Sequence, residues 1–174
     1  MENFDDWLRK AKRGDSLAMF ELGFMYDTGN GVPVDKEKAF HWYKKCADKK
    51  TGNAVAMAQY VLGSMYEKGK YIERDLEKAF QYYKASAENG YGEAQCVLAN
   101  MYYDGNPIPK DFEKAFFWYS ESADADEPEA QFKLAMMYLE GEGTKKDKEA
   151  ATYWLKEAVK NGYEEDRVFR KKNK

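Results

Sequence analysis

The sequence predicts an all-α protein: an α-α solenoid with a right-handed superhelix, built from four helix-turn-helix repeats with N- and C-terminal capping helices. Three observations predict it. A Leu-small-x-Met-Tyr core occurs four times, beginning at Leu22, Leu62, Leu98 and Leu134. A glycine follows each of these tyrosines at a fixed distance, and an aspartate follows each glycine. The core recurs about every 36 to 40 residues, within the range of helical repeat arrays.

The chain is expected to begin with a capping helix within residues 1–14. Phe4, Trp7, Leu8 and Ala11 are spaced i, i+3, i+4 and i+7, which places them on one face of a helix. The residues between them are mostly charged. Trp7 also stands nearly as far before the alanine of the next first helix as the aromatic residues of the second helices do in later repeats. This helix therefore resembles the second half of a preceding repeat.

The first helix of each repeat carries an alanine, then the core leucine four residues later and the tyrosine four further on, which is one helical face. A small residue beside the leucine would let a neighbouring helix approach closely; these residues are Gly23, Gly63, Ala99 and Ala135. The glycine after the tyrosine predicts a helix end in the left-handed conformation, at Gly29, Gly69, Gly105 and Gly141.

The second helix of each repeat is predicted to start at an aspartate, with a glutamate two positions later. Aspartate is a preferred N-cap, and an acidic residue in the first turn favours the helix dipole. We assign these carboxylates to helix capping and not to catalysis; the caps are Asp35, Asp75, Asp111 and Asp147. Aromatic residues follow at positions that should pack between helices, such as Trp42-Tyr43.

The predicted organisation is one solenoid domain over residues 1–174. It has a cap at 1–14, repeats at 15–52, 53–90, 91–126 and 127–162, and a C-terminal cap with a basic tail at 163–174. The first junction holds four extra residues around Lys49 to Gly52. This polar loop is a solvated linker or a segment that touches a partner; both interpretations stay open.

The repeated unit resembles the Sel1-like repeats, relatives of the tetratricopeptide repeats. The resemblance covers residues 15 to 162. It is carried by Ala18, Leu22-Gly23, Met25-Tyr26, Gly29-Asn30-Gly31-Val32, Asp35, Lys38-Ala39, Trp42-Tyr43 and Ala47, with their counterparts in the later repeats. Tetratricopeptide repeats have a period of 34 and lack the Gly-x-Gly-Val loop before a capping Asp. The middle repeats depart from the pattern, because Tyr71 and Pro107 replace the second loop glycine.

Composition suits a folded protein, with 44% hydrophobic and 16% aromatic residues and a formal net charge of −3. A negative chain argues against nucleic-acid binding, which would need a basic face. We find no transmembrane stretch and no leader pattern at the start of the chain, so we expect a cytoplasmic protein that does not bind membranes. We also expect a monomer, because Asp166 and Arg170 make the end of the solenoid polar.

Catalytic and metal-binding patterns are sparse. His41, the single histidine, occupies a position that tolerates any residue, and we interpret it as a surface side chain. Cys46 and Cys96 fall at a small and a bulky packed position, so both are predicted to be packed thiols. No cofactor, metal or catalytic residue is expected.

The residues that vary at exposed positions are the candidate binding residues, because the shared ones are occupied with packing. The resemblance implies that the first helices line the concave face of the solenoid. Four positions per repeat then form the candidate protein-binding face: Leu17, Glu21, Phe24 and Thr28; Met57, Val61, Ser64 and Lys68; Glu93, Val97, Asn100 and Asp104; Glu129, Lys133, Met136 and Glu140. The apolar members could instead be part of the interface with the next helix.

We therefore expect a non-catalytic protein–protein interaction module, an adaptor, scaffold or regulator that binds a protein or peptide partner on this concave face. The resemblance leaves two alternatives. An immunity or inhibitory protein that binds a toxic effector is a specific form of the same function. A β-lactam-binding or hydrolysing enzyme, as in the cysteine-rich branch of the family, is a different class, but the regular cysteine pairs of that branch are absent. Self-association through the end of the solenoid is a third interpretation.

Overall fold

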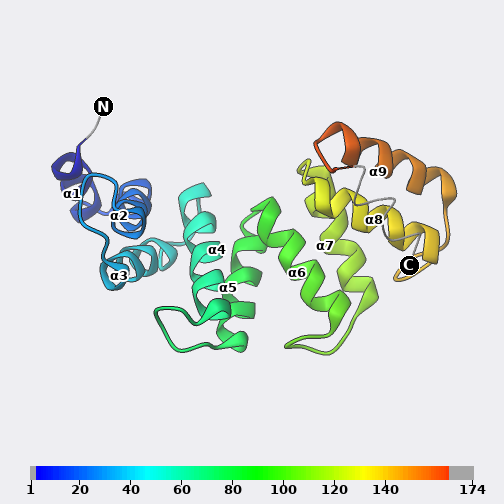
Figure 1. The fold of residues 1–174 in the computed structure, drawn as a ribbon, viewed down its shortest axis with the longest axis horizontal. Coiled ribbons are helices and arrows are strands. Elements are labelled where there is room, and N and C mark those ends of the chain that lie inside the picture. Colours follow the sequence, from blue (N-terminus) through cyan, green and yellow to red (C-terminus); the bar gives the residue numbers. More distant parts are fainter. Residues whose placement is uncertain (1–2, 165–174) are drawn as a thin grey trace. The chain divides into compact units, whose positions relative to one another are not determined.

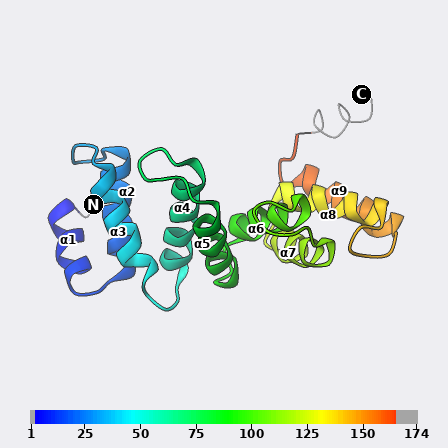
Figure 2. The same ribbon diagram turned by 90° about the horizontal axis from the view of Figure 1, so that it is seen from below.

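The computed structural model describes residues 3–164, and within that range all regular secondary structure is α-helical (Figures 1 and 2). The predicted all-α class is confirmed. The helices are α1 (Phe4–Lys12), α2 (Ser16–Thr28), α3 (Lys36–Ala47), α4 (Asn53–Lys68), α5 (Leu76–Glu88), α6 (Gly92–Asp104), α7 (Phe112–Asp124), α8 (Pro128–Glu140) and α9 (Lys148–Lys160).

The helices fall into two compact units, Met1–Tyr91 with α1 to α5 and Gly92–Lys174 with α6 to α9. We call them the N-terminal and C-terminal units and describe each by itself. Within each unit the helices pack in sequential pairs, one pair per repeat, as Figures 1 and 2 show for α2 with α3 and α4 with α5. Between residues 3 and 164, every helix is too short or too polar to span a lipid bilayer.

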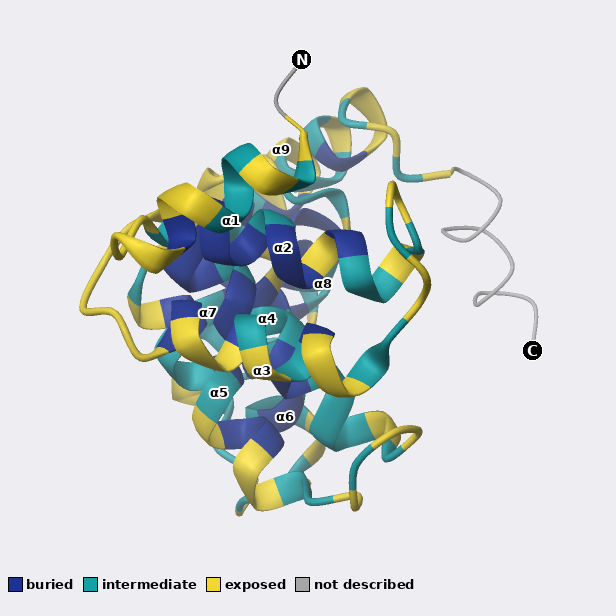
Figure 3. Ribbon diagram, turned by 90° about the vertical axis from the view of Figure 1, so that its left-hand side faces the viewer, coloured by how far each residue is buried: buried dark blue, intermediate teal, exposed yellow. Residues whose placement is uncertain are grey.

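The core of each unit is formed by the residues that the repeats share (Figure 3). The four core leucines are at most 1% exposed, and the alanines four residues before them are 0% exposed. In the N-terminal unit the buried cluster joins the first helices to Tyr43 of α3. In the C-terminal unit Tyr119 of α7 has the same role. The sequence prediction of the inward face is therefore confirmed.

Close helix approach explains the small residue beside each core leucine. A Cβ atom added at Gly23 would lie 2.7 Å from the Tyr43 ring, and one added at Gly63 would lie 2.8 Å from the Tyr83 ring. A side chain at either position would thus have to displace an aromatic residue of the second helix. The glycine lets that ring pack directly on the backbone of the first helix.

The loop between the paired helices is fixed at both ends as predicted. Gly29, Gly69 and Gly141 end their helices in the left-handed conformation, with φ of 80°, 60° and 75°. At the next helix the Asp35 carboxylate accepts from the Lys38 N–H at 3.0 Å. The structure adds a bond that the sequence did not indicate: in the first repeat the Asp35 N–H donates to the Tyr26 carbonyl at 2.9 Å, and the other three repeats have its counterpart.

The first helix, α1, packs as the second half of a preceding repeat, in agreement with the sequence. Phe4 meets Tyr26 edge-on with ring centroids 5.7 Å apart, and Phe40 meets Tyr66 in the same way at 5.9 Å. Most of the predicted C-terminal cap and basic tail, residues 165–174, lies outside the described residues. The bounds of the predicted domain and repeats stay a prediction.

A small buried position on the second helices forms a hydrogen bond to the start of the first helix of the same repeat. The Ser86 hydroxyl donates to the Ala56 carbonyl at 2.6 Å, and the Ser122 hydroxyl donates to the Gly92 carbonyl at 2.8 Å. In the first repeat this position is Cys46, whose Sγ lies 3.1 Å from the Ser16 carbonyl oxygen. From the sequence, the position of Cys46 is identified only as small and packed.

The two cysteines are expected to resist thiol reagents in the folded protein. Both are free and buried, and burial raises the pKa of the Cys46 thiol to about 11 and that of the Cys96 thiol to about 12. Because the thiolate is the reactive species, a pKa two units higher leaves about 100-fold less of it at pH 8. Ellman's reagent should therefore modify the native protein at least about 100-fold more slowly than the urea-unfolded chain.

The same pKa shifts predict how stability depends on pH. The folded-state pKa values of the two thiols lie above the ordinary value of 9.0, so folding favours the protonated thiols. Their contribution to the free energy of unfolding is complete below about pH 9 and is lost as pH rises through 11 to 12. Thermal melts from pH 7 to 11 should show a decline that begins near pH 9. In the labelling experiment, fast modification of either thiol by Ellman's reagent at pH 8 would contradict the burial of the two cysteines.

Candidate functional site

All sixteen predicted binding positions lie outside the buried core in their own unit. In the N-terminal unit α2 presents two large apolar side chains to solvent, with Leu17 51% and Phe24 43% exposed. On α4, Met57 and Val61 are half-buried and pack partly against the core cluster. The remaining positions of this unit are Glu21, Thr28, Ser64 and Lys68, of which Thr28 and Lys68 are exposed.

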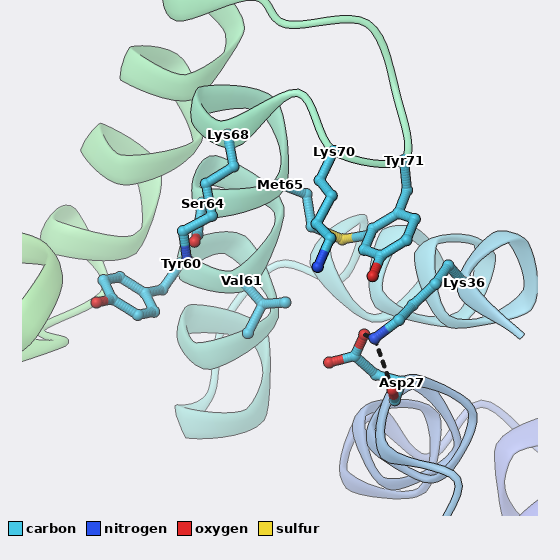
Figure 4. A pocket seen from close by; sticks show the side chains of 9 residues that line it. All are labelled: Asp27, Lys36, Tyr60, Val61, Ser64, Met65, Lys68, Lys70 and Tyr71. Carbon is cyan, nitrogen blue, oxygen red and sulfur yellow. Dashed lines mark hydrogen bonds and ion pairs between the residues drawn. The ribbon is translucent and has the colours of Figure 1, made fainter. Parts of the chain in front are cut away.

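A cavity of about 320 Å³ in the N-terminal unit includes three of the predicted residues, Val61, Ser64 and Lys68 (Figure 4). Three segments build it: the α2–α3 connection, one side of α4 and the loop that follows α4. The lining residues are Asp27, Lys36, Tyr60, Val61, Ser64, Met65, Lys68, Lys70 and Tyr71. We call this hollow the α4 cavity.

An ion pair holds the α2–α3 side of the α4 cavity in place. The Lys36 ammonium lies 2.6 Å from the Asp27 carboxylate and donates to the Asp27 backbone carbonyl at 2.7 Å. Asp27 lies in the last turn of α2 and Lys36 in the first turn of α3. The contact therefore ties the two ends of the connection together beside the cavity, as the dashed line in Figure 4 shows.

The loop after α4 contributes a positive side and an aromatic side to the α4 cavity. Tyr71 occupies the loop position that is a glycine in the first and last repeats. The ammonium groups of Lys36 and Lys70 lie 5.0 Å and 5.3 Å from the centroid of the Tyr71 ring, which is cation–π distance. Within residues 3–164, no carboxylate forms an ion pair with Lys68 or Lys70.

Val61 and Met65 of α4 give the α4 cavity an apolar floor (Figure 4). Tyr60 and Ser64 add hydroxyl groups along the same helix. Apolar area with a few placed polar groups is the usual composition of a binding site. Such an arrangement can hold a side chain or short peptide segment by burial and by charge.

In the C-terminal unit the predicted positions are also outside the core, but several of them are held by the fold. Asn100 accepts a hydrogen bond from the Tyr119 hydroxyl at 2.5 Å. Lys133 lies 5.8 Å from the centroid of the Tyr103 ring. The other predicted positions of this unit are Glu93, Val97, Asp104, Glu129, Met136 and Glu140, of which the four carboxylates are exposed. This face is the more acidic of the two.

An aromatic cluster stands in the C-terminal unit where the N-terminal unit has the Asp27–Lys36 ion pair. Tyr103 and Phe112 occupy the equivalent positions, with ring centroids 5.2 Å apart. The Tyr103 hydroxyl donates to the Glu142 carboxylate at 2.7 Å. This hydrogen bond, together with partial burial, raises the pKa of Tyr103 to about 12. The repeat fold therefore does not itself require the lysine-lined arrangement of the α4 cavity.

A second exposed surface lies on the second helices. Phe117 of α7 is 52% exposed and Tyr153 of α9 is 55% exposed, and each meets its neighbouring tryptophan edge-on. His41 occupies the same register position on α3 and is exposed, in agreement with the sequence. These side chains are the main apolar alternative to the first-helix faces.

The paired helices, the shared core and the variable first-helix residues define a helical repeat protein. The sequence model of the Sel1 repeat matches residues 16–50, 56–91, 92–127 and 128–163. The chain belongs to the Sel1 repeat family. Proteins of this family generally mediate protein–protein interactions and are typically non-catalytic.

Solved structures of Sel1 repeat proteins have the same fold. The protective antigen c5321 of uropathogenic Escherichia coli is 30% identical, with a TM-score of 0.83, over 93% of this chain and 34% of its own. A Sel1 repeat protein from Oxalobacter formigenes is 31% identical, with a TM-score of 0.81, over 91% of this chain and 63% of its own. This chain thus spans about a third of the length of the first relative and somewhat under two thirds of the length of the second.

A more distant structure, the cysteine rich protein B of Helicobacter pylori, shares the fold at 23% identity and a TM-score of 0.57. The match covers 79% of this chain and 96% of that protein. No curated protein sequence matches the chain. The comparisons therefore show the family and the fold of this chain.

Proposed function

We propose that this protein is a non-catalytic interaction module that binds a protein or peptide partner on the exposed faces of its first helices. The observation that carries the proposal is the separation of roles along α2 and α4. The shared alanine and leucine of these helices are buried, while the predicted binding residues are exposed or half-buried and three of them line the α4 cavity. Packing accounts for the first group and leaves the second group available for binding.

Exposed apolar area on these helices supports the proposal. Leu17 and Phe24 of α2 keep about half of their surface in water in the folded protein. On α4, Val61 lies between the core and the α4 cavity. Exposed apolar area on a protein surface is a feature of protein–protein interaction sites. A bound segment would bury these side chains at the centre of its interface.

Affinity capture from native lysate tests the proposed face. We expect the wild-type chain to enrich a partner at least tenfold over Val61→Asp, because a carboxylate buried at an apolar contact costs well over the roughly 1.4 kcal/mol that a tenfold change requires. Gln81→Asp is the matched control, since position 81 is exposed on α5 in the same repeat. Far-UV circular dichroism and melting should show that both variants are folded.

Two outcomes would contradict the proposed face. Equal capture by wild type, Val61→Asp and Gln81→Asp would remove α4 from the interface. Loss of the partner with Phe117→Asp, but not with Val61→Asp, would transfer binding to the exposed second-helix surface of the C-terminal unit.

A further inference from the structure

We propose that the α4 cavity recognises an acidic residue flanked by a large apolar residue in an extended peptide segment of the partner. This inference rests on the proposed function and names the chemistry of its ligand. The carboxylate would lie between the ammonium groups of Lys68 and Lys70. The apolar side chain would lie on Val61 and Met65, against the ring of Tyr71.

The balance of charge at the α4 cavity indicates an acidic ligand. Three lysines converge on it from the start of α3, the end of α4 and the following loop, and Asp27 is the one acidic residue in its lining. Lys36 is already neutralised by its ion pair with Asp27. Lys68 and Lys70 are both exposed, and Figure 4 shows the Lys70 side chain extending over the cavity towards Val61. Two positive charges therefore remain for a ligand, on a chain whose net charge is −3.

The second part of the ligand follows from the floor of the α4 cavity. Its volume of about 320 Å³ is at the lower end of the range for ligand pockets, so it suits one large side chain and not a whole domain. Val61, Met65 and the exposed face of Tyr71 offer apolar contact to that side chain. Because the lysines and the apolar floor belong to one hollow, the carboxylate and the apolar group should be neighbours in the ligand.

The other half of the chain provides an internal comparison for the charge. By repeat register, Glu140 and Glu142 of the C-terminal unit correspond to Lys68 and Lys70. Glu142 is occupied by the hydrogen bond from Tyr103. The same framework therefore tolerates the opposite charge at both positions. The lysine pair of the α4 cavity is not a requirement of the fold, which leaves it available for recognition.

A phage-displayed library of random twelve-residue peptides, selected against the wild-type protein, tests the inference. The enriched sequences should share an Asp or Glu next to a large apolar residue. The best peptide, labelled with fluorescein, is then titrated by fluorescence anisotropy. We expect Lys68→Ala/Lys70→Ala to weaken it at least about tenfold, in line with the loss of charge-assisted hydrogen bonds. Replacing the peptide's Asp or Glu by Asn or Gln should have a similar effect.

Lys145→Ala/Lys146→Ala is the matched control, because it removes the same charge from an exposed loop outside the α4 cavity lining. This control variant should bind the best peptide with the affinity of the wild type. The inference is overturned if the two double-lysine variants bind the best peptide with the same affinity. It is also overturned if the selected peptides carry no acidic residue, or if selection yields no binder. A third result would be selected peptides that carry no acidic residue and yet bind the wild type but not the Val61→Asp variant. That result would overturn the acidic preference alone and would still support binding on the first-helix face.

Discussion

Replacing Leu62 by alanine is expected to lower the free energy of unfolding by about 2 to 5 kcal/mol. Leu62 is 0% exposed and belongs to the buried cluster of the N-terminal unit. The substitution removes buried methyl groups and leaves a space that the close-packed helices can only partly fill. Urea denaturation followed by circular dichroism measures the change.

Leu17→Ala is the control for this experiment, because it makes the same chemical change at a side chain that is 51% exposed. Its effect on unfolding should stay within about 0.5 kcal/mol, as for most surface substitutions. If the two variants were equally stable, the shared leucine would not be the core position that every repeat depends on. The pair also separates packing from binding, since Leu17 belongs to the proposed binding face.

Gly143→Ala is expected to destabilise the C-terminal unit by about 2 to 3 kcal/mol, from backbone strain and a steric collision together. Gly143 has φ of +67°, a conformation that residues with a side chain rarely adopt. A Cβ atom there would also overlap the carbonyl oxygen of Phe112, which belongs to the backbone of α7 and cannot rotate away. The loop before α9 would have to move, and urea denaturation should show the loss.

Gly31→Ala isolates the part of this effect that comes from backbone conformation. Gly31 occupies the same loop position in the first repeat and has φ of +76°. Its added Cβ would meet only the flexible end of Met25, at 3.3 Å. We expect a cost of about 1 kcal/mol from the positive φ alone. Equal losses at the two positions would show that the contact between Gly143 and Phe112 is unimportant.

The fold could be predicted from the sequence because each repeated residue has a local physical role. A glycine four residues after Met25 ends α2, and Asp35 caps α3, whatever the rest of the chain does. Repetition makes these signals stronger, since the same role recurs in every repeat. The bond from the Asp35 N–H to the Tyr26 carbonyl could not be predicted, because it depends on how the loop closes.

The candidate site was only partly predictable, for a related reason. Helical periodicity placed Val61, Ser64 and Lys68 on one side of a helix, and the structure brings all three to the α4 cavity. Lys36 and Lys70 were missed, since they reach the cavity through the start of a helix and an irregular loop. Only the replacement of the loop glycine by Tyr71 gave a signal there, and the sequence did not show where that ring would lie.

The C-terminal unit shows the same limit of sequence reasoning. Lys133 is one of the sixteen positions that the sequence predicts for the binding face. In the structure it lies near the Tyr103 ring, beside the hydrogen bond from Tyr103 to Glu142. Those two residues are 39 positions apart, so only the packing of one repeat on the next brings them together. Variation between repeats therefore identifies exposed positions without telling which of them the fold already occupies.

Site-specific photo-crosslinking tests most directly whether the first-helix face binds the partner. Benzoylphenylalanine would be placed at position 61 of α4 in one variant and at position 81 of α5 in the other, and each would be irradiated in native lysate. Our account predicts one discrete crosslinked protein from position 61 and none from position 81. A crosslink from position 81 alone, or the same products from both positions, would contradict binding on the first-helix face.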